Sequence, residues 1–452
     1  MSKHAELRIL ACSLNAYHGR GIVQVRRIGL AGLVTVMAVA VVGCTSNGDG
    51  ARPAAAVATS TTIHQHSAPA ALTSDASPRE VRARFEQLLG QHALLAVRLT
   101  RSEAARSPDL EQVVQGSLAT NAGALEQVVG VTYDPAQAEK FKQLWSGYTG
   151  ELAAYGKAAA AGDSEAAQEA RTALLDGCED WGAWLAGASG GRVAAGTATQ
   201  SAKARVEQLM AQADAYADKD YARAYTLERE TYERTYGTGT TLATASLPAK
   251  TAAGLDSAPE NLRSAFAMLL GEHMELIVDA QRATFAGSPE FEAVAAQVNA
   301  NTATLTKALS GIVGPAKAKE FQTAWANHVE GLMAYTAAAA GKDEAAKTVA
   351  KENLDGFAER LALFFSDVVR NVLATDPLTE AFTSHDEHLI NQVDAYAAKD
   401  YARAQQVQDE GYQQMLGVAN VLVDAIEKVM AKSLPAGGST TGGGGTATHV
   451  HP

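Results

Sequence analysis

Four histidines in the C-terminal part of this 452-residue chain are placed as a buried metal site would require. His273, His328, His385 and His388 each fall on the apolar stripe of an expected helix, where such residues recur every three or four positions. Histidines that point inward from different helices of a bundle can share one ion, and imidazole suits zinc and copper. Met415, on the last expected helix, offers a thioether suited to Cu(I). These five side chains are the candidate ligands, and copper or zinc is the candidate ion.

The earlier part of the chain gives a competing interpretation of the same histidines. The residues 180 or 181 positions before the four histidines are, in the same order, His92, Tyr148, Arg205 and Gln208. A histidine beside a tyrosine is readily explained as a buried hydrogen-bonded pair that fixes the register of two helices. We therefore interpret these positions first as a polar network within the core and second as a metal site. Any metal site is expected in the second part.

An internal repeat underlies this correspondence. Segments 141–145 and 321–325 share their Phe and Trp, and segments 215–224 and 395–404 share most residues, both with an offset of 180. Many ordered matches at one offset indicate two copies of one domain. We call residues 79–246 the first half and residues 260–433 the second half, and we expect 247–259 to be the linker between them.

The composition of each half favours helices. Ala, Leu, Glu, Gln and Lys dominate over the β-branched residues that strands prefer. Asp220 and Asp400 are expected to cap helices, and Asp376 is expected to be an N-cap with Pro377 in the first helical position. The predicted fold is all-α, with two tandem homologous antiparallel helical bundles of five or six helices each.

The N-terminal region has the composition of an export leader. Basic residues, including Arg26 and Arg27, precede an apolar run over 28–42, which ends at Gly43 and Cys44. This arrangement resembles the lipobox of bacterial lipoproteins, in which the thiol receives a diacylglyceryl group and the leader is removed. A transmembrane anchor is the alternative, but about fifteen apolar residues are fewer than the ~20 that span a bilayer. The resemblance implies acyl chains such as palmitate on Cys44.

Low-complexity segments flank the two halves. We expect a signal peptide over 1–43, a disordered tether over 44–78 and a disordered Gly/Thr-rich tail over 434–452. His64 and His66 in the tether, and His449 and His451 in the tail, are pairs that bind metals only weakly. The alanine-rich style of the chain is similar to that of actinobacterial secreted proteins.

Charge and motifs exclude several classes of function. The formal net charge of −12 disfavours binding to nucleic acid. The sequence contains no P-loop, no dinucleotide-binding fingerprint and no H-E-x-x-H motif, and the G-x-S-x-G match around Ser189 follows an expected helix instead of a strand. Cys178 is expected to be a small residue of the core. We therefore do not expect an enzyme.

These observations predict a lipid-anchored, non-catalytic binding or scaffolding protein on the outer face of the cell membrane. Its lipid anchor would hold it to the membrane, and its partner would be a protein or another part of the cell envelope. The alternative is a copper- or zinc-binding protein with a histidine site in the second half.

Overall fold

The described part of the chain is helical throughout, which confirms the predicted all-α class. The computed structural model describes residues 72–105 and 107–433, and all regular secondary structure there consists of helices. The first long helices are α2 (Pro78–Ala104), α3 (Pro108–Thr132), α4 (Pro135–Ala161), α5 (Ser164–Ala188), α6 (Ala195–Ala217) and α7 (Tyr221–Ser246). The later ones are α9 (Ala258–Ala286), α10 (Phe291–Val313), α11 (Pro315–Gly341), α12 (Glu344–Val368), α13 (Thr375–Ala397) and α14 (Tyr401–Ser433). Between α7 and α9 lie a short helix, α8 (Ala249–Ala252), and a 3-10 turn, η1 (Ala253–Asp256).

Local sequence signals explain where the helices begin. Asp220 and Asp400 cap α7 and α14 as expected, since each carboxylate accepts a hydrogen bond from the backbone N–H three residues later. The cap predicted at Asp376 is wrong, because α13 begins at Thr375 after Ala374. Asp376 and Pro377 therefore lie within the first turn. Proline is tolerated there because the first N–H groups of a helix have no partner within the helix.

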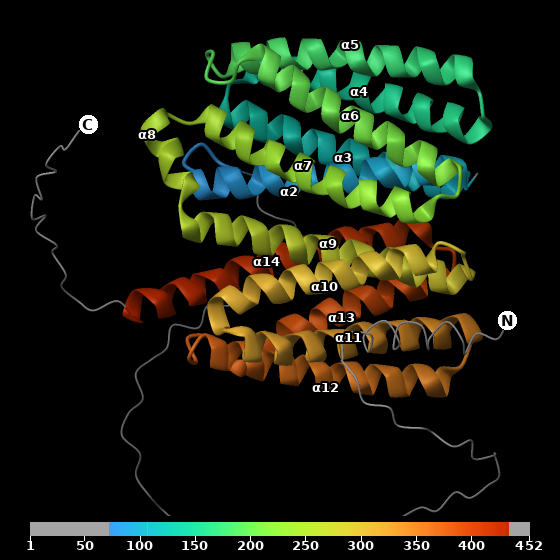
Figure 1. The fold of residues 1–452 in the computed structure, drawn as a ribbon, viewed down its shortest axis with the longest axis vertical. Helices are drawn as coiled ribbons and strands as arrows, with labels where there is room; N and C mark the ends of the chain where they lie inside the picture. Colours follow the sequence, from blue (N-terminus) through green and yellow to red (C-terminus); the bar gives the residue numbers. More distant parts are fainter. Residues whose placement is uncertain (1–71, 106, 434–452) are drawn as a thin grey trace, which may run out of the picture. The chain divides into compact units, whose positions relative to one another are not determined.

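The long helices are arranged around two central pairs (Figure 1). α2 packs along α7, and α9 packs along α14. The hairpin-like series α4–α5–α6 packs on the first pair, and α11–α12–α13 packs on the second pair. α2 and α7 also contact α9, so the two pairs meet at the centre. Among the described helices, none combines the length and the hydropathy that crossing a membrane requires.

Two glycines allow the close approach at this centre. The hydroxyls of Tyr232 (α7) and Tyr412 (α14) lie 3.1 Å apart. A Cβ atom added at Gly90 (α2) or at Gly271 (α9) would lie 2.8 Å from an atom of this tyrosine pair. Both glycines are therefore needed for space, and not for an unusual backbone angle.

Buried ion pairs join α2 to α9 beside the tyrosines. Arg98 Nη2 lies 2.5 Å from Glu275 Oε2, and Arg101 Nη1 lies 2.6 Å from Asp279 Oδ2. All four side chains are at most 10% exposed. Breaking such a pair leaves a buried charge without compensation, which is strongly destabilising, so these pairs fix the register of α2 against α9.

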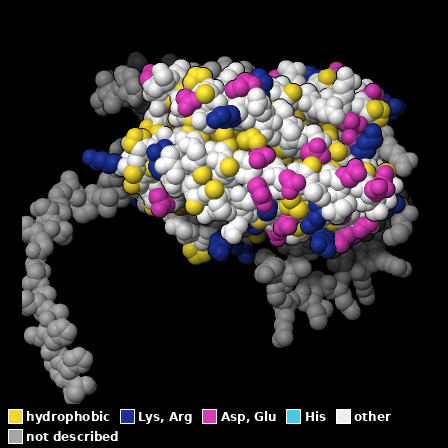
Figure 2. All heavy atoms as spheres, turned by 90° about the horizontal axis from the view of Figure 1, so that it is seen from above, with side chains coloured by type: hydrophobic (Ala, Val, Ile, Leu, Met, Phe, Trp, Pro, Cys, Tyr) yellow, Lys and Arg dark blue, Asp and Glu magenta, His cyan; other side chains and the backbone are white. Residues whose placement is uncertain are grey.

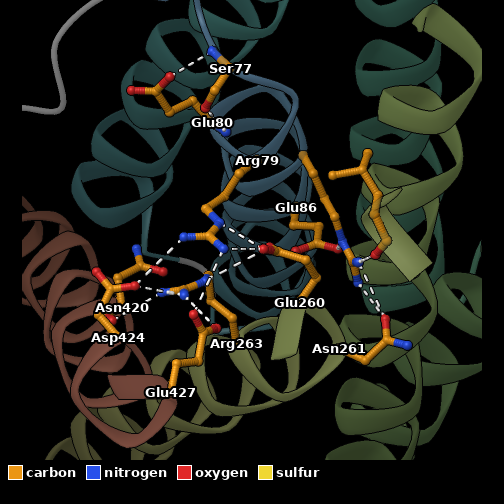
Figure 3. A network of polar contacts seen from close by, with 12 residues as sticks. Ser77, Arg79, Glu80, Glu86, Glu260, Asn261, Arg263, Asn420, Asp424 and Glu427 are labelled. Atoms are coloured by element: carbon orange, nitrogen blue, oxygen red, sulfur yellow. Dashed lines mark hydrogen bonds and ion pairs between the residues drawn. The ribbon is translucent and has the colours of Figure 1, made fainter. Parts of the chain in front are cut away.

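A second charged cluster joins α2, α9 and α14 near the start of α2 (Figure 3). Arg79 donates to Glu260, and Arg263 contacts Asp424 at 2.7 Å and Glu427 at 3.0 Å. Arg79 and Asp424 are about half exposed, so solvent weakens this cluster relative to the buried pairs.

Removing the space at Gly271 should destabilise the fold. We expect Gly271→Ala to lower the free energy of unfolding by about 1–3 kcal/mol, because the new methyl group overlaps the tyrosine pair. Gly116→Ala is the matched control, since the added Cβ meets no atom within 4 Å and should raise helix stability by up to about 1 kcal/mol. Urea denaturation measures both. Equal effects of the two substitutions would contradict the packing described here.

Candidate metal centre

Three of the four predicted histidines converge in the interior of the second half. His273 comes from α9, His328 from α11 and His385 from α13, and they are 0%, 1% and 2% exposed. One ring nitrogen of each lies within 4.8 Å of one nitrogen of each of the others. The ring centroids are 5.5–5.8 Å apart. Side chains from three helices thus form one compact triangle, which we call the histidine triad.

Aromatic side chains enclose the histidine triad. The ring of Trp325 lies 4.6 Å from that of His273 and 5.6 Å from that of His328. Phe357 of α12 stacks on His328 with 4.5 Å between the ring centroids. This shell follows from the helical period, because Trp325 and His328 are three residues apart on the buried face of α11.

Asp386 is a buried carboxyl that the sequence interpretation missed. Its Oδ1 lies 3.2 Å from Nδ1 of His328, and the residue is 3% exposed. The sequence did contain a signal, because Asp386 lies four residues after Phe382 and three before Leu389, both on the predicted apolar stripe. A carboxyl on that stripe needs a partner in the core.

Burial keeps all four groups uncharged. It lowers the pKa of His273 to about 3. Burial, reinforced by neighbouring imidazoles, also lowers the pKa of His328 and of His385 well below the ordinary value. The same loss of solvent raises the pKa of Asp386 well above its usual 3.8. The apoprotein therefore presents neutral imidazoles, the form that binds metal ions.

The polar atoms of this group have no hydrogen-bond partners. Both ring nitrogens of each histidine in the triad, and both carboxyl oxygens of Asp386, are buried and unpaired by hydrogen bonds. Buried polar groups in native proteins are nearly always satisfied. An unsatisfied set of acceptors and donors that faces one point is what a missing ion or ligand would explain.

The other predicted ligands lie apart from the triad. His388 is buried on α13, and its Nδ1 lies 2.6 Å from the carbonyl oxygen of Ser384. Met415 is buried on α14 and lines a small apolar cavity of about 10 Å³ together with Trp325 and Phe382. Cys44 and the paired histidines of the tether and tail lie outside the described residues.

The first half has the same scaffold with different polar groups. The ring of His92 lies 4.5 Å from that of Trp145 and 5.6 Å from that of Tyr148. The expected hydrogen bond between His92 and Tyr148 is not formed, because neither histidine nitrogen nor the tyrosine hydroxyl has a partner. The guanidinium of Arg205 occupies the position of the third histidine, 5.2 Å from the ring centre of Tyr148. A fixed cation at this place leaves no site for a metal ion.

Two smaller sequence predictions concern the same half. Cys178 is a buried free thiol, as expected. Ser189 follows the last residue of α5, where its hydroxyl accepts a hydrogen bond from the backbone of Val193.

Comparison with protein-family models, curated proteins and solved structures finds no match for this chain. The interpretation of the site therefore depends on its geometry and chemistry alone.

The depressed pKa of His92 should make the fold sensitive to acid. Burial, with the nearby charge of Arg205, lowers this pKa to about 3, so below pH 6.5 the unfolded chain binds a proton that the folded chain does not. Stability is thus complete above pH 6.5 and falls towards pH 3. Between about pH 5.5 and 4 we expect His92→Leu to reduce the pH slope of the unfolding free energy by about 1.4 kcal/mol per pH unit.

Urea denaturation of both proteins at a series of pH values measures the two slopes. Above pH 7 the slopes should coincide, which provides the internal control. Parallel slopes over the whole acidic range would show that the folded state protonates His92 normally.

Proposed function

We propose that this protein binds one zinc or copper ion in the second half, through His273, His328 and His385. The observation that carries the proposal is the convergence of three neutral, unpaired imidazoles from three different helices. Bundles build metal centres from inward side chains on facing helices. Zinc and copper both accept imidazole nitrogen, and the three helices already hold the ligands in place.

The distances suit an ion after a small adjustment. Nitrogens bound to one ion at 2.0–2.1 Å in a tetrahedral arrangement lie about 3.3 Å apart. The nitrogens here lie within 4.8 Å of one another, so rotations of the side chains suffice to bring them to an ion. A shift of the helices by a whole turn is not required.

Asp386 fits the role of an orienting carboxylate. Its oxygen faces Nδ1 of His328, which leaves Nε2 of this ring as the nitrogen for the ion. Histidine ligands commonly use their second nitrogen to contact a carboxylate, which fixes the ring and raises its basicity. Loss of the Asp386 proton on binding would also offset part of the charge of the ion.

The burial of the triad supports a retained ion and not a catalytic one. Catalytic zinc sites keep an open position for water or substrate, whereas these ligands are at most 2% exposed. Exchange of the ion would require the helices to separate transiently. We therefore propose a non-catalytic metal-binding protein.

We also propose that the two halves are tandem copies of one bundle, residues 79–246 and 260–433, joined by 247–259. Equivalent contacts support this. The hydroxyl of Tyr155 donates to Asp214 as that of Tyr335 donates to Asp394, and both pairs are offset by 180 residues. In this account only one copy keeps a metal site.

The placement of the protein is a separate proposal. The segment that ends at Cys44 supports export and a lipid anchor, which would present both halves outside the cytoplasm at the outer face of the cell membrane. Binding to a protein partner has less support. The large apolar side chains exposed among the described residues are Val131, Val349 and Leu363, and the last two lie about 21 Å apart along α12. Figure 2 shows one face on which apolar and charged side chains are interspersed.

Metal analysis of purified protein tests the proposed site. The full chain should carry His64, His66, His449 and His451 replaced by alanine, so that the tether and tail contribute no ligands. In this background we expect one zinc or copper ion per chain, and we expect His273→Ala to abolish stoichiometric binding. His92→Ala is the matched control, because His92 is equally buried beside the corresponding tryptophan but has no triad. Asp386→Asn should weaken binding by about 10- to 100-fold.

Calorimetric titration with Zn²⁺, and with Cu⁺ under reducing conditions, gives the affinities, and circular dichroism checks the folding of each variant. Equal metal content in the His273→Ala and His92→Ala proteins would overturn the proposal. So would a folded parent protein that binds neither ion.

Cell fractionation tests the lipid anchor. In a bacterial host that processes lipoproteins, we expect the unaltered protein in the membrane fraction and Cys44→Ala in the soluble or secreted fraction. Cys178→Ala should stay with the membrane, since this thiol is buried in the first half. Membrane association of Cys44→Ala with an intact leader would instead support a transmembrane anchor.

A further inference from the structure

The first half contains a cavity large enough for a small molecule. It lies between α4, α5 and α6, which pack together on the α2–α7 pair (Figure 1), and its volume is about 670 Å³. Sites for small organic ligands have volumes of roughly 300–1,000 Å³. The side chains that matter here are Trp145, Tyr148, Trp181, Trp184 and Arg205, and we call this space the tryptophan cavity.

Arg205 is the unusual residue of the tryptophan cavity. It is 4% exposed, and its guanidinium carbon lies 5.5 Å and 5.9 Å from the ring centres of Trp145 and Trp181. Its Nε has no hydrogen-bond partner, and no described carboxylate lies within the 4.0 Å of an ion pair. By contrast, the buried guanidinium groups of Arg98 and Arg101 are paired with carboxylates. Arg205 is thus a buried cation whose only described stabilising partners are aromatic faces.

Further hydrogen-bond donors around the cavity also have no acceptor. The indole nitrogens of Trp145 and Trp184 and the hydroxyl of Tyr148 are buried without partners. Indole N–H and guanidinium groups only donate hydrogen bonds, and a tyrosine hydroxyl can donate one. A ligand that satisfies this set must supply acceptor oxygens, and one that compensates Arg205 must be negatively charged.

The shape and rim of the cavity narrow the choice further. Three indole rings offer flat apolar surface, which a bare inorganic ion would leave uncovered. A carboxylate matches the fork of donors on a guanidinium, because both groups are planar and can form two parallel hydrogen bonds. The charged rim residues Lys140, Asp176 and Asp180 are exposed, so solvent screens them relative to the buried Arg205.

We propose that the tryptophan cavity binds a small organic carboxylate, whose carboxylate group pairs with Arg205 and whose apolar body lies against Trp145 and Trp181. This site is independent of the histidine triad. The two halves then use equivalent positions for different ligands: His385 faces a metal ion, and Arg205, 180 residues earlier, faces an anion.

Tryptophan fluorescence of the full chain tests this inference. Trp325→Phe removes the one tryptophan outside the cavity, so the remaining signal comes from the site. The probes are benzoate, phenylacetate and hexanoate, with benzamide as the neutral isostere of benzoate and inorganic phosphate as the bare anion. We expect a saturable change with at least one carboxylate, and binding weaker by about tenfold or more for benzamide and for phosphate.

Substitutions of Arg205 complete the test. Arg205→Gln should abolish carboxylate binding, Arg205→Lys should retain part of it, and Arg223→Gln, an exposed change on α7, should leave it unaltered. Calorimetry confirms each affinity. Equal binding of benzoate and benzamide, a preference for phosphate, or no response to any carboxylate up to about 10 mM would overturn the proposal. The comparison of benzoate with benzamide needs no Arg205 variant, so it decides the matter even if Arg205→Gln does not fold.

Discussion

The burial of α9 on two opposite faces is the constraint on which the rest of the structure depends. Glu275 and Asp279 point from this helix towards the arginines of α2, and His273, two residues before Glu275, lies about 200° around the helix. Each face therefore carries polar groups that must find partners inside the protein. The ion pairs with α2 fix the helix in rotation and height, and this fixed position holds His273 against α11 and α13. The register of the central helices thus determines the geometry of the candidate metal centre.

The two halves show two physical solutions to one problem. Each half places a histidine beside a tryptophan in the core, where an uncompensated polar group is unfavourable. The second half surrounds the histidine with two more imidazoles, a set that an ion can satisfy. The first half supplies a fixed cation, Arg205, which calls for an anion instead. In this account, substitutions at two equivalent positions redirect a shared scaffold from a metal ion to an organic carboxylate.

The sequence predicted the features that depend on helical periodicity. Apolar spacing placed Trp325 and His328 on one buried face of α11, and the repeat indicated that a metal site, if present, belongs to the second half. It did not distinguish His385, which joins the triad, from His388, which contacts the carbonyl oxygen of Ser384. The two residues lie one turn apart on the same stripe, and only the packing of neighbouring helices decides which ring reaches the centre. The role of Asp386 and the ion pairs between the halves were missed for the same reason, because both depend on contacts between distant helices.

X-ray absorption spectroscopy of the metal-loaded protein tests the central claim most directly. The sample should be the full chain without the histidines of the tether and tail, loaded with one equivalent of Zn²⁺. The account predicts three imidazole nitrogens at about 2.0–2.1 Å from the ion, with the outer-shell scattering that imidazole rings produce, and loss of this pattern in His385→Ala. A coordination shell of oxygen atoms without imidazole scattering, or a spectrum unchanged by His385→Ala, would contradict it.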